Sequence, residues 1–187
     1  MILPAETSQL DQVGEIFREY AAWVGDDICF VSFQKELADL PGRYAPPQGR
    51  LLLDWQEDRL AACVGLREFA PGVGEVKRLY VRPEFQGRGL GRALAERVIG
   101  EARAVGYRLL RLDTLPRMER AIPLYRALGF REIPKYADNP DTAICLELRL
   151  DESAHTRETL DRRYHDLESG RVQLMAKTGE RRRHRPA

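Results

Sequence analysis

The segment that decides the fold is EVKRLYVRPEFQGRGLGRAL, residues 75–94. Residues 75–81 carry Val, Leu and Tyr among charged side chains and predict a strand. From residue 90 to residue 105 apolar residues recur at helical spacing, and Gly106 is the predicted C-cap. Residues 108–114 predict another strand. Strand, helix and strand within about 40 residues favour a right-handed parallel crossover.

The glycine-rich string QGRGLGR, residues 86–92, stands between that strand and that helix. Glycines let the backbone approach a ligand without Cβ clashes, and the free N–H groups of a helix N-terminus suit a pyrophosphate. Arg88 and Arg92 add charge-assisted contacts. The string lacks the Gly-Lys-Ser/Thr ending of a Walker loop, and Arg92 occupies the third glycine position of a dinucleotide fingerprint. Taken alone, the glycines are equally consistent with a turn that merely starts a helix.

Two helices and a hairpin are predicted before this segment. Apolar residues at spacings of three and four predict a helix over residues 10–24, with Thr7 or Ser8 as its N-cap. A shorter helical pattern covers residues 33–40. Short apolar runs separated by the polar string QED predict an antiparallel hairpin within residues 51–66.

The segment after the crossover predicts one more helix and a strand pair. Residues 121–128 predict the helix, in which Pro123 must lie in the first turn or cause a kink. Residues 130–136 and 143–150 predict the strands, and Pro134 confines the first of them to a sheet edge or a bulge.

The predicted domain covers residues 1–150, and a charged extension covers residues 151–187. Within the extension, Leu160, Tyr164 and Leu167 form one narrow apolar stripe. This stripe predicts a short helix that docks on the domain or faces a second copy in a homodimer. A disordered end is expected to follow it.

The charge balance points to no nucleic-acid or membrane partner. Lysine plus arginine number 30 and aspartate plus glutamate 29, which leaves a formal charge of +1 and no global attractive field. The basic run RRRHR at residues 181–185 lacks accompanying base-stacking aromatics and is read as a solvated end. The chain has no leader-like start and no stretch of about 20 apolar residues, so a cytoplasmic protein is predicted.

The cysteines and histidines predict neither disulfides nor a metal site. Cys29, Cys63 and Cys145 are far apart and outside any CxxC pattern, so free thiols are expected, the last two within strand cores. The three histidines all fall in the extension with unsuitable ligand spacing. They are His155, His165 and His184.

Together with LYRALGF at residues 124–130, the deciding segment resembles the GNAT superfamily of N-acetyltransferases. The pyrophosphate motif of that superfamily is Gln or Arg, two residues, Gly, one residue, then Gly or Ala. Gln86, Gly89 and Gly91 match this motif position for position. The resemblance implies an α/β (α+β) fold with a mixed, mostly antiparallel central sheet of about six to seven strands flanked by helices. Its fourth and fifth strands are expected to splay apart.

The resemblance also implies acetyl-CoA as co-substrate. Backbone groups of Leu79, Tyr80 and Val81 would bond the pantetheine arm as a missing strand would, although Leu79 and Val81 also suit ordinary strand core. The residues implied in binding the pyrophosphate are Gln86, Gly87, Arg88, Gly89, Leu90, Gly91 and Arg92.

Acetyl transfer needs a neutral amine and a proton for the departing thiolate. The resemblance implies Tyr125 as the acid, and Glu75 is the candidate base. Strict alternation puts Lys77 on the face of Glu75, where its charge would weaken the base, unless a β-bulge separates them. The alternative readings are a surface ion pair for Glu75 and a packed helix aromatic for Tyr125.

Three further positions bear on the site. Asp113 is either an acceptor-binding residue or a turn cap, and a backbone N–H near Tyr80 is expected to polarise the thioester carbonyl. Met118 stands where many GNAT relatives have asparagine. A contact to the cofactor is therefore expected to be missing, which argues against a protein N-terminal acetyltransferase.

These observations predict an N-acetyltransferase that moves acetyl from acetyl-CoA to a primary amine by direct transfer through a tetrahedral intermediate. The expected acceptor is a small molecule or an amino-acid-like metabolite. One alternative is a regulatory module that binds acyl-CoA without turnover and would not need Glu75 or Tyr125. Another is a protein lysine or N-terminal acetyltransferase.

Overall fold

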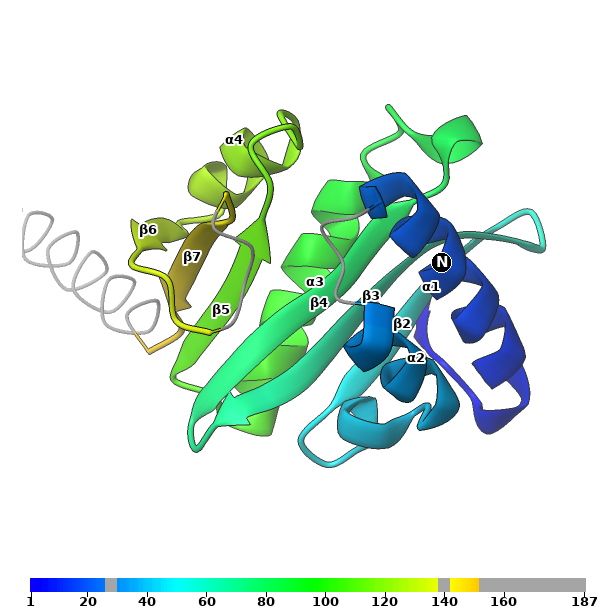
Figure 1. Cartoon of the computed structure of the whole chain (residues 1–187), viewed down its shortest axis with the longest axis horizontal. Helices are drawn as coiled ribbons and strands as arrows, with labels where there is room; N and C mark the ends of the chain where they lie inside the picture. Colours follow the sequence, from blue (N-terminus) through cyan, green and yellow to red (C-terminus); the bar gives the residue numbers. More distant parts are fainter. Residues whose placement is uncertain (26–29, 138–141, 152–187) are drawn as a thin grey trace, which may run out of the picture. The chain divides into compact units, whose positions relative to one another are not determined.

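The computed structural model describes residues 1–25, 30–137 and 142–151, and residues 1–150 form one compact unit (Figure 1). The helices are α1 (Leu10–Val24), α2 (Phe30–Ala38), α3 (Leu90–Val105) and α4 (Ala121–Ala127). The strands are β1 (Ile2–Pro4), β2 (Arg50–Gln56), β3 (Arg59–Ala70), β4 (Val73–Val81), β5 (Leu109–Thr114), β6 (Arg131–Ile133) and β7 (Ile144–Arg149).

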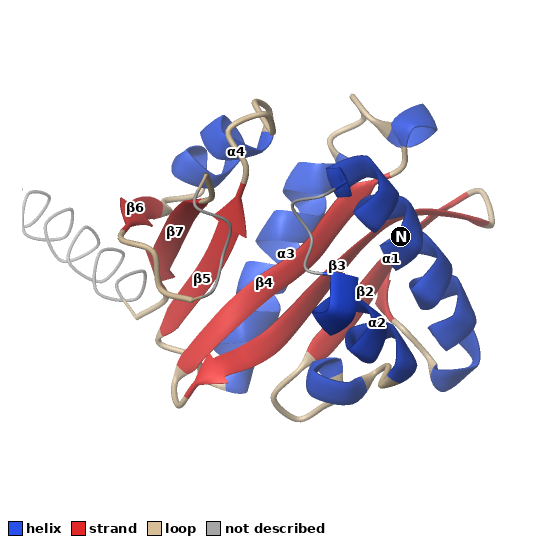
Figure 2. Ribbon diagram, viewed as in Figure 1, coloured by secondary structure: helices blue, strands red, loops and turns tan. Residues whose placement is uncertain are grey.

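The described strands form one seven-stranded sheet in the order β1-β2-β3-β4-β5-β7-β6 (Figure 2). Neighbouring strands are antiparallel except for β4 and β5, which are parallel. Their pairing covers Val73–Glu75 against Leu109–Arg111 and goes no further, although both strands continue. The predicted mixed sheet with splayed fourth and fifth strands is therefore confirmed.

Helices cover both faces of this sheet (Figure 1). On one face, α3 packs Leu94, Val98 and Ala102 against alternate residues of β2 and β3, such as Leu52 and Val64. On the other face, α1 and α2 cover the intervening strand positions. The core of this second face includes Val13, Ile16, Phe17, Phe33, Leu51, Leu53, Leu60, Cys63 and Tyr80. The alternation predicted for the hairpin therefore places apolar side chains in two separate layers.

Turn and cap residues hold the elements around the crossover. Gly106 follows α3 with φ 95°, the left-handed conformation expected of a glycine C-cap. Glu57 and Asp58 form the predicted hairpin turn with φ 50° and 63°. Pro123 lies in the first turn of α4, where its missing N–H has no helical acceptor to serve.

Four details differ from the sequence prediction. Strand β1 was not predicted, because three residues carry too little pattern. Strand β6 is an edge strand as expected but ends at Ile133, since Pro134 cannot donate to a ladder. Thr7 and Ser8 belong to a 3-10 turn capped by Glu6, so neither is the N-cap of α1. Helix α2 begins at Phe30, three residues earlier than predicted.

The apolar stripe of the extension, the three histidines, the basic run and Cys29 lie outside the described residues. Among the described residues, no helix has the length and apolar character needed to cross a membrane. No group of three or more metal-ligating side chains is found within the same ranges. Cys63 and Cys145 are buried in the sheet as thiols that form no disulfide, as predicted.

Candidate active site

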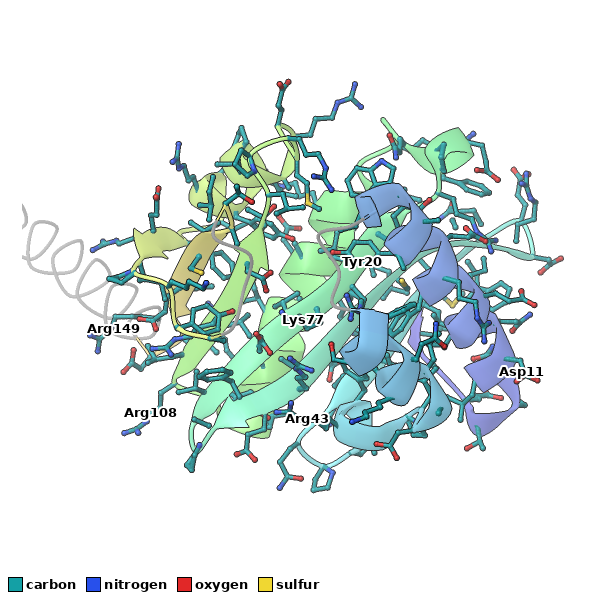
Figure 3. The ribbon with its side chains drawn as sticks, in the orientation of Figure 1. Asp11, Tyr20, Arg43, Lys77, Arg108 and Arg149 are labelled. Atoms are coloured by element: carbon teal, nitrogen blue, oxygen red, sulfur yellow. The ribbon has the colours of Figure 1, made fainter. Side chains whose placement is uncertain are left out.

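A cleft of about 1440 Å³ opens where β4 and β5 diverge. It runs from the N-terminus of α3 across β4 to α1 and α2. Figure 3 shows Tyr20 of α1 and Lys77 of β4 over this central part of the sheet. The predicted site residues that line it are Glu75, Leu79, Tyr80, Val81, Gln86, Gly87, Gly89, Leu90, Gly91, Arg92 and Tyr125. The structure thus brings all of them except Arg88 to one cavity.

The glycine loop forms an open cradle at one end of the cleft. Gly87 and Gly89 have φ of 78° and 80°, and a Cβ added to either would meet nothing within 4 Å. Gly89 is the N-cap of α3, so the first N–H groups of a 16-residue helix face this opening. Free N–H groups at the positive end of a helix dipole bind anions well.

The polar side chains of the loop have partners within the protein. Gln86 Nε2 donates to the Val81 carbonyl at 3.1 Å, so the side chain bridges the loop and β4. Arg88 donates to the Glu84 carbonyl and stacks on Phe85, which turns it away from the cleft lining. Arg92 pairs with Glu96 one helical turn on, at 2.8 Å and in an exposed position. Exposed pairs of this kind are weak, so Arg92 is available to an anion.

A β-bulge interrupts β4 beside the cleft. The register runs from Gly65↔Lys77 to Cys63↔Tyr80, so β4 has one residue more than β3. Arg78 adopts the left-handed backbone conformation at the bulge, with φ 56°. Because of the extra residue, the Tyr80 side chain lies on the face of the sheet that α1 covers. Glu36 of α2 accepts two hydrogen bonds from the Arg78 guanidinium, at 2.7 and 3.0 Å. This bidentate contact with one residue of a distant helix holds the unusual backbone of the strand.

The bulge lies after Lys77, so it does not separate Lys77 from Glu75 as one predicted arrangement required. Lys77 Nζ lies 3.3 Å from Glu75 Oε1. Arg67 donates to Glu75 Oε2 at 2.8 Å, and the Tyr136 hydroxyl donates to Oε1 at 3.1 Å. The Glu75 side chain is 1% exposed.

Burial and the charged neighbours of Glu75 determine the protonation state of its carboxyl group. Burial alone would raise the pKa of the Glu75 carboxyl, but the charges of Lys77 and Arg67 outweigh burial and lower it below its usual value. The group is an enclosed carboxylate with partners on both oxygens. Such a carboxylate orients its neighbours well and accepts a proton poorly.

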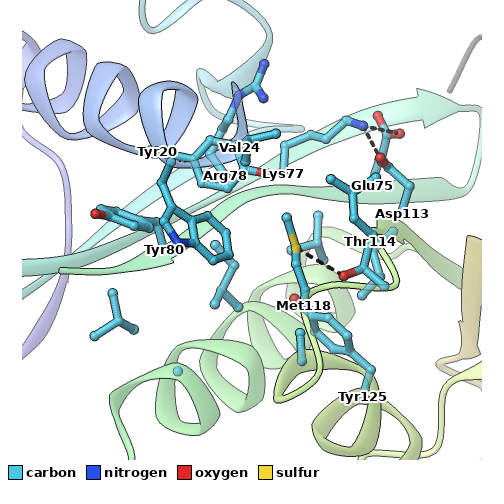
Figure 4. Close-up of a pocket in the computed structure, with 18 of the residues that line it drawn as sticks. Tyr20, Val24, Glu75, Lys77, Arg78, Tyr80, Asp113, Thr114, Met118 and Tyr125 are labelled. Carbon is cyan, nitrogen blue, oxygen red and sulfur yellow. Dashed lines mark hydrogen bonds and ion pairs between the residues drawn. The ribbon is translucent and has the colours of Figure 1, made fainter. Parts of the chain in front are cut away.

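Lys77 joins Glu75 to Asp113 across the fork, which is the gap where β4 and β5 splay apart. Its ammonium donates to Asp113 Oδ1 of β5 at 2.5 Å (Figure 4). The side chains of Lys77 and Asp113 are 18% and 21% exposed. Arg67, Glu75, Lys77 and Asp113 therefore alternate in charge from the buried sheet to the cleft.

Tyr125 reaches the cleft from α4, below the fork (Figure 4). Its ring packs against Phe130 edge to face, with centroids 5.5 Å apart. Burial raises the pKa of the Tyr125 phenol, and the nearby Tyr20 and Asp113 raise it further. The phenol stays protonated, as a proton donor must.

Met118 precedes α4 in the sequence and lines the cleft. Its sulfur accepts a hydrogen bond from Thr114 Oγ1 at 3.3 Å (Figure 4). A thioether is a weak acceptor and cannot donate, so a contact that needs an asparagine N–H is absent at this position.

The sequence did not predict the roles of Arg67, Arg78 and Glu36. Their contacts join β3, β4 and α2, and periodicity within one segment contains no information about such pairs. The weak local signal was a run of alternating charge, with Glu75, Lys77 and Arg78 inside a strand next to a cleft.

The splayed sheet and the glycine cradle define a class of transferase, and comparison with known families gives the same class. The Acetyltransferase (GNAT) family profile matches residues 10–130. The chain therefore belongs to the GNAT acetyltransferase family.

Two relatives illustrate its place in the family. The chain is 38% identical over 133 residues to an uncharacterized N-acetyltransferase of Schizosaccharomyces pombe, covering 70% of this chain and 82% of the relative. It is 33% identical over 128 residues to the IAA acetyltransferase of Azospirillum brasilense, covering 68% and 82%.

Solved structures share the fold. A GNAT acetyltransferase from Staphylococcus aureus superposes with a TM-score of 0.69 at 18% identity, covering 80% of this chain and 98% of that one. An acetyltransferase from Salmonella typhimurium, solved with its cofactor acetyl-CoA, gives 0.65 at 21% identity, covering 80% and 93%.

Proposed function

We propose that the protein transfers the acetyl group of acetyl-CoA to a primary amine of a small molecule. The observation that supports this most is the open cradle of Gly87 and Gly89 at the N-terminus of α3, beside the unpaired part of β4. One end of the cleft suits a diphosphate and its middle suits an extended arm. The acetyl-CoA complex of the Salmonella neighbour supports the same assignment.

The cradle would hold the diphosphate through the amides of residues 86–92, with Arg92 supplying charge. Beyond Glu75, β4 has no described strand partner on the side of β5. Backbone groups of Leu79, Tyr80 and Val81 would bond the pantetheine arm there, although Gln86 already occupies the Val81 carbonyl.

In the transfer step, the amine nitrogen forms a bond to the thioester carbonyl carbon, and the carbon–sulfur bond breaks. A backbone N–H near Tyr80 would stabilise the oxyanion. Tyr125 would give its proton to the departing thiolate. The ammonium proton of the acceptor passes to water before attack. The second proton on the attacking nitrogen passes through water to the Tyr125 phenolate, which leaves acetylated amine, CoA thiol and the original phenol.

Glu75 fits a positioning role better than that of the base. Its two oxygens have partners in Arg67, Lys77 and Tyr136, and its pKa is lowered. We place Glu75 as the residue that holds Lys77 and Arg67 at the fork.

Thiol release from acetyl-CoA tests the function. A panel of primary amines, IAA, a lysine peptide and an N-terminal alanine peptide is mixed with protein, and free CoA is followed over time. IAA is included because a relative carries that name, and the alanine peptide because the bS18-alanine N-acetyltransferase of Escherichia coli is 32% identical over 91 residues. Faster release with a small amine than with either peptide is expected. CoA binding with no release in any arm would favour the regulatory module.

The substitution Glu75→Gln should lower stability at pH 7 by about 2 kcal/mol, because the half-buried cations Arg67 and Lys77 lose the anionic partner that they share. The folded pKa of Glu75 is depressed, so its contribution is present above the unfolded pKa near 4.3 and disappears as pH falls through the folded value. Urea unfolding of both proteins should show the difference shrinking below about pH 4. An equal difference at both pH values would contradict the assigned charge.

A further inference from the structure

Asp113 presents an incompletely used carboxylate to the middle of the cleft. Its Oδ1 accepts the Lys77 ammonium at 2.5 Å, while no described residue donates a hydrogen bond to Oδ2. Asp113 lies on β5 beyond the last residue that pairs with β4. The carboxylate therefore faces the place where the strands separate (Figure 4).

The side chain already bound to Asp113 indicates which kind of ligand this carboxylate can bind. Lys77 supplies a primary alkylammonium, the same group that an amine acceptor carries at neutral pH. The geometry around Oδ1 is thus suited to an –NH₃⁺ group on an alkyl stem. An acceptor that entered the cleft would present this group to the same carboxylate.

Lys77 also has a second carboxylate within reach. Glu75 Oε1 lies 3.3 Å from its Nζ, so the lysine keeps an ionic partner if it leaves Asp113. A buried or half-buried cation without a partner is costly, and this arrangement avoids that cost. An acceptor ammonium can therefore replace that of Lys77 at Asp113 without leaving Lys77 unpaired.

The rest of the cleft suits an apolar body behind the ammonium. Tyr20, Trp23 and Tyr80 line it as a group of rings with centroids 6.0 to 6.4 Å apart. The Trp23 side chain is 51% exposed although it is large and apolar. An aromatic or aliphatic amine would cover these rings.

We propose that Asp113 binds the ammonium group of the acceptor, and that Lys77 is a resident ammonium that gives way to it by moving onto Glu75. This inference rests on the proposed function and names its substrate class as primary amines that are cationic at neutral pH. It concerns acceptor binding before the chemical step. Asp113 is accordingly a specificity-determining residue, and Glu75 is the residue that receives Lys77.

Calorimetry on the CoA-loaded protein tests the proposal without requiring turnover. The probes are phenethylamine, which is a primary ammonium with an aromatic body, and phenethyl alcohol, which has the same body without the charge. Asp113→Asn should weaken phenethylamine binding by roughly 10- to 100-fold, because one charged hydrogen bond is lost. Binding of the alcohol and of CoA should stay within about threefold.

Two further variants separate acceptor binding from a structural role. Glu147→Gln removes a carboxylate of similar exposure, 20%, that pairs with Arg111 at 2.7 Å outside the cleft lining. It should leave amine binding unchanged. Lys77→Met should tighten amine binding or leave it unchanged, since it removes the resident competitor.

Several results would overturn the proposal. These are unchanged amine binding in Asp113→Asn, equal losses in Asp113→Asn and Lys77→Met, and failure of the wild type to bind phenethylamine more tightly than the alcohol. Equal losses would mean that Asp113 acts only by holding Lys77. CoA thiol release, measured in the same solutions, reports the proposed function separately. Ammonium binding that depends on Asp113 but gives no release would contradict that function and support this inference.

Discussion

Tyr125→Phe is expected to lower kcat by about 100-fold while leaving CoA affinity nearly unchanged. The hydroxyl is lost, but the ring keeps its edge-to-face packing on Phe130, so α4 should retain its position. The departing thiolate would then leave without a proton donor or a hydrogen bond from Tyr125. General acid catalysis contributes roughly 10²- to 10⁴-fold, and the raised pKa of this phenol favours the lower end.

Steady-state kinetics with the best amine of the panel and calorimetry with CoA measure these two effects separately. Tyr107→Phe is the matched control, because it removes a phenol that donates to the Gln48 carbonyl away from the cleft lining. Its kcat should stay within about twofold of the wild type. A Tyr125→Phe enzyme as fast as Tyr107→Phe would remove Tyr125 from the mechanism.

The parts of the fold that the sequence predicted are those with strong local patterns. Residues 75–114 contain a strand, a glycine turn, a capped helix and a second strand, and each has its own signal within one window. Gly87 and Gly89 adopt positive φ, a conformation that glycine allows at little cost. The residue type alone therefore predicted a turn at these positions. The order of strands was less accessible, since β7 inserts between β5 and β6.

The sequence contained a local signal for the glycine loop that lines the cleft, but none for the contacts between side chains from distant segments. The Lys77–Asp113 pair joins residues 36 positions apart, and the Arg78–Glu36 pair joins residues 42 apart. A bulge between Glu75 and Lys77 was one arrangement open from the sequence, but the bulge lies after Lys77, because alternation indicates the faces of a strand and not where an extra residue is inserted. This position of the bulge left Glu75 beside Lys77 and changed its interpretation from a base to a positioning carboxylate.

Gly89→Glu is expected to raise the Kd for CoA by at least about 100-fold in a protein that still folds. Position 89 is the N-cap of α3, where a carboxylate accepts hydrogen bonds from the first helical N–H groups. The new side chain would therefore take the donors that the diphosphate needs and would repel it by charge. The same interaction stabilises the helix, which offsets part of the strain of a side chain at φ 80°.

Two control variants separate the effect of backbone strain on CoA affinity from the effect of the added negative charge. Gly89→Ala has the same unfavourable φ without a carboxylate, and its Cβ meets nothing within 4 Å, so its loss of CoA affinity should be no more than about tenfold. Gly100→Glu adds the same charge to the exposed middle of α3, where a Cβ also has open space, and should leave CoA binding unchanged. Calorimetry with CoA gives the affinities, and urea unfolding shows that each variant folds. If Gly89→Glu bound CoA as tightly as Gly100→Glu, the diphosphate could not lie at the N-terminus of α3, and the anion site would have to be sought elsewhere along the cleft.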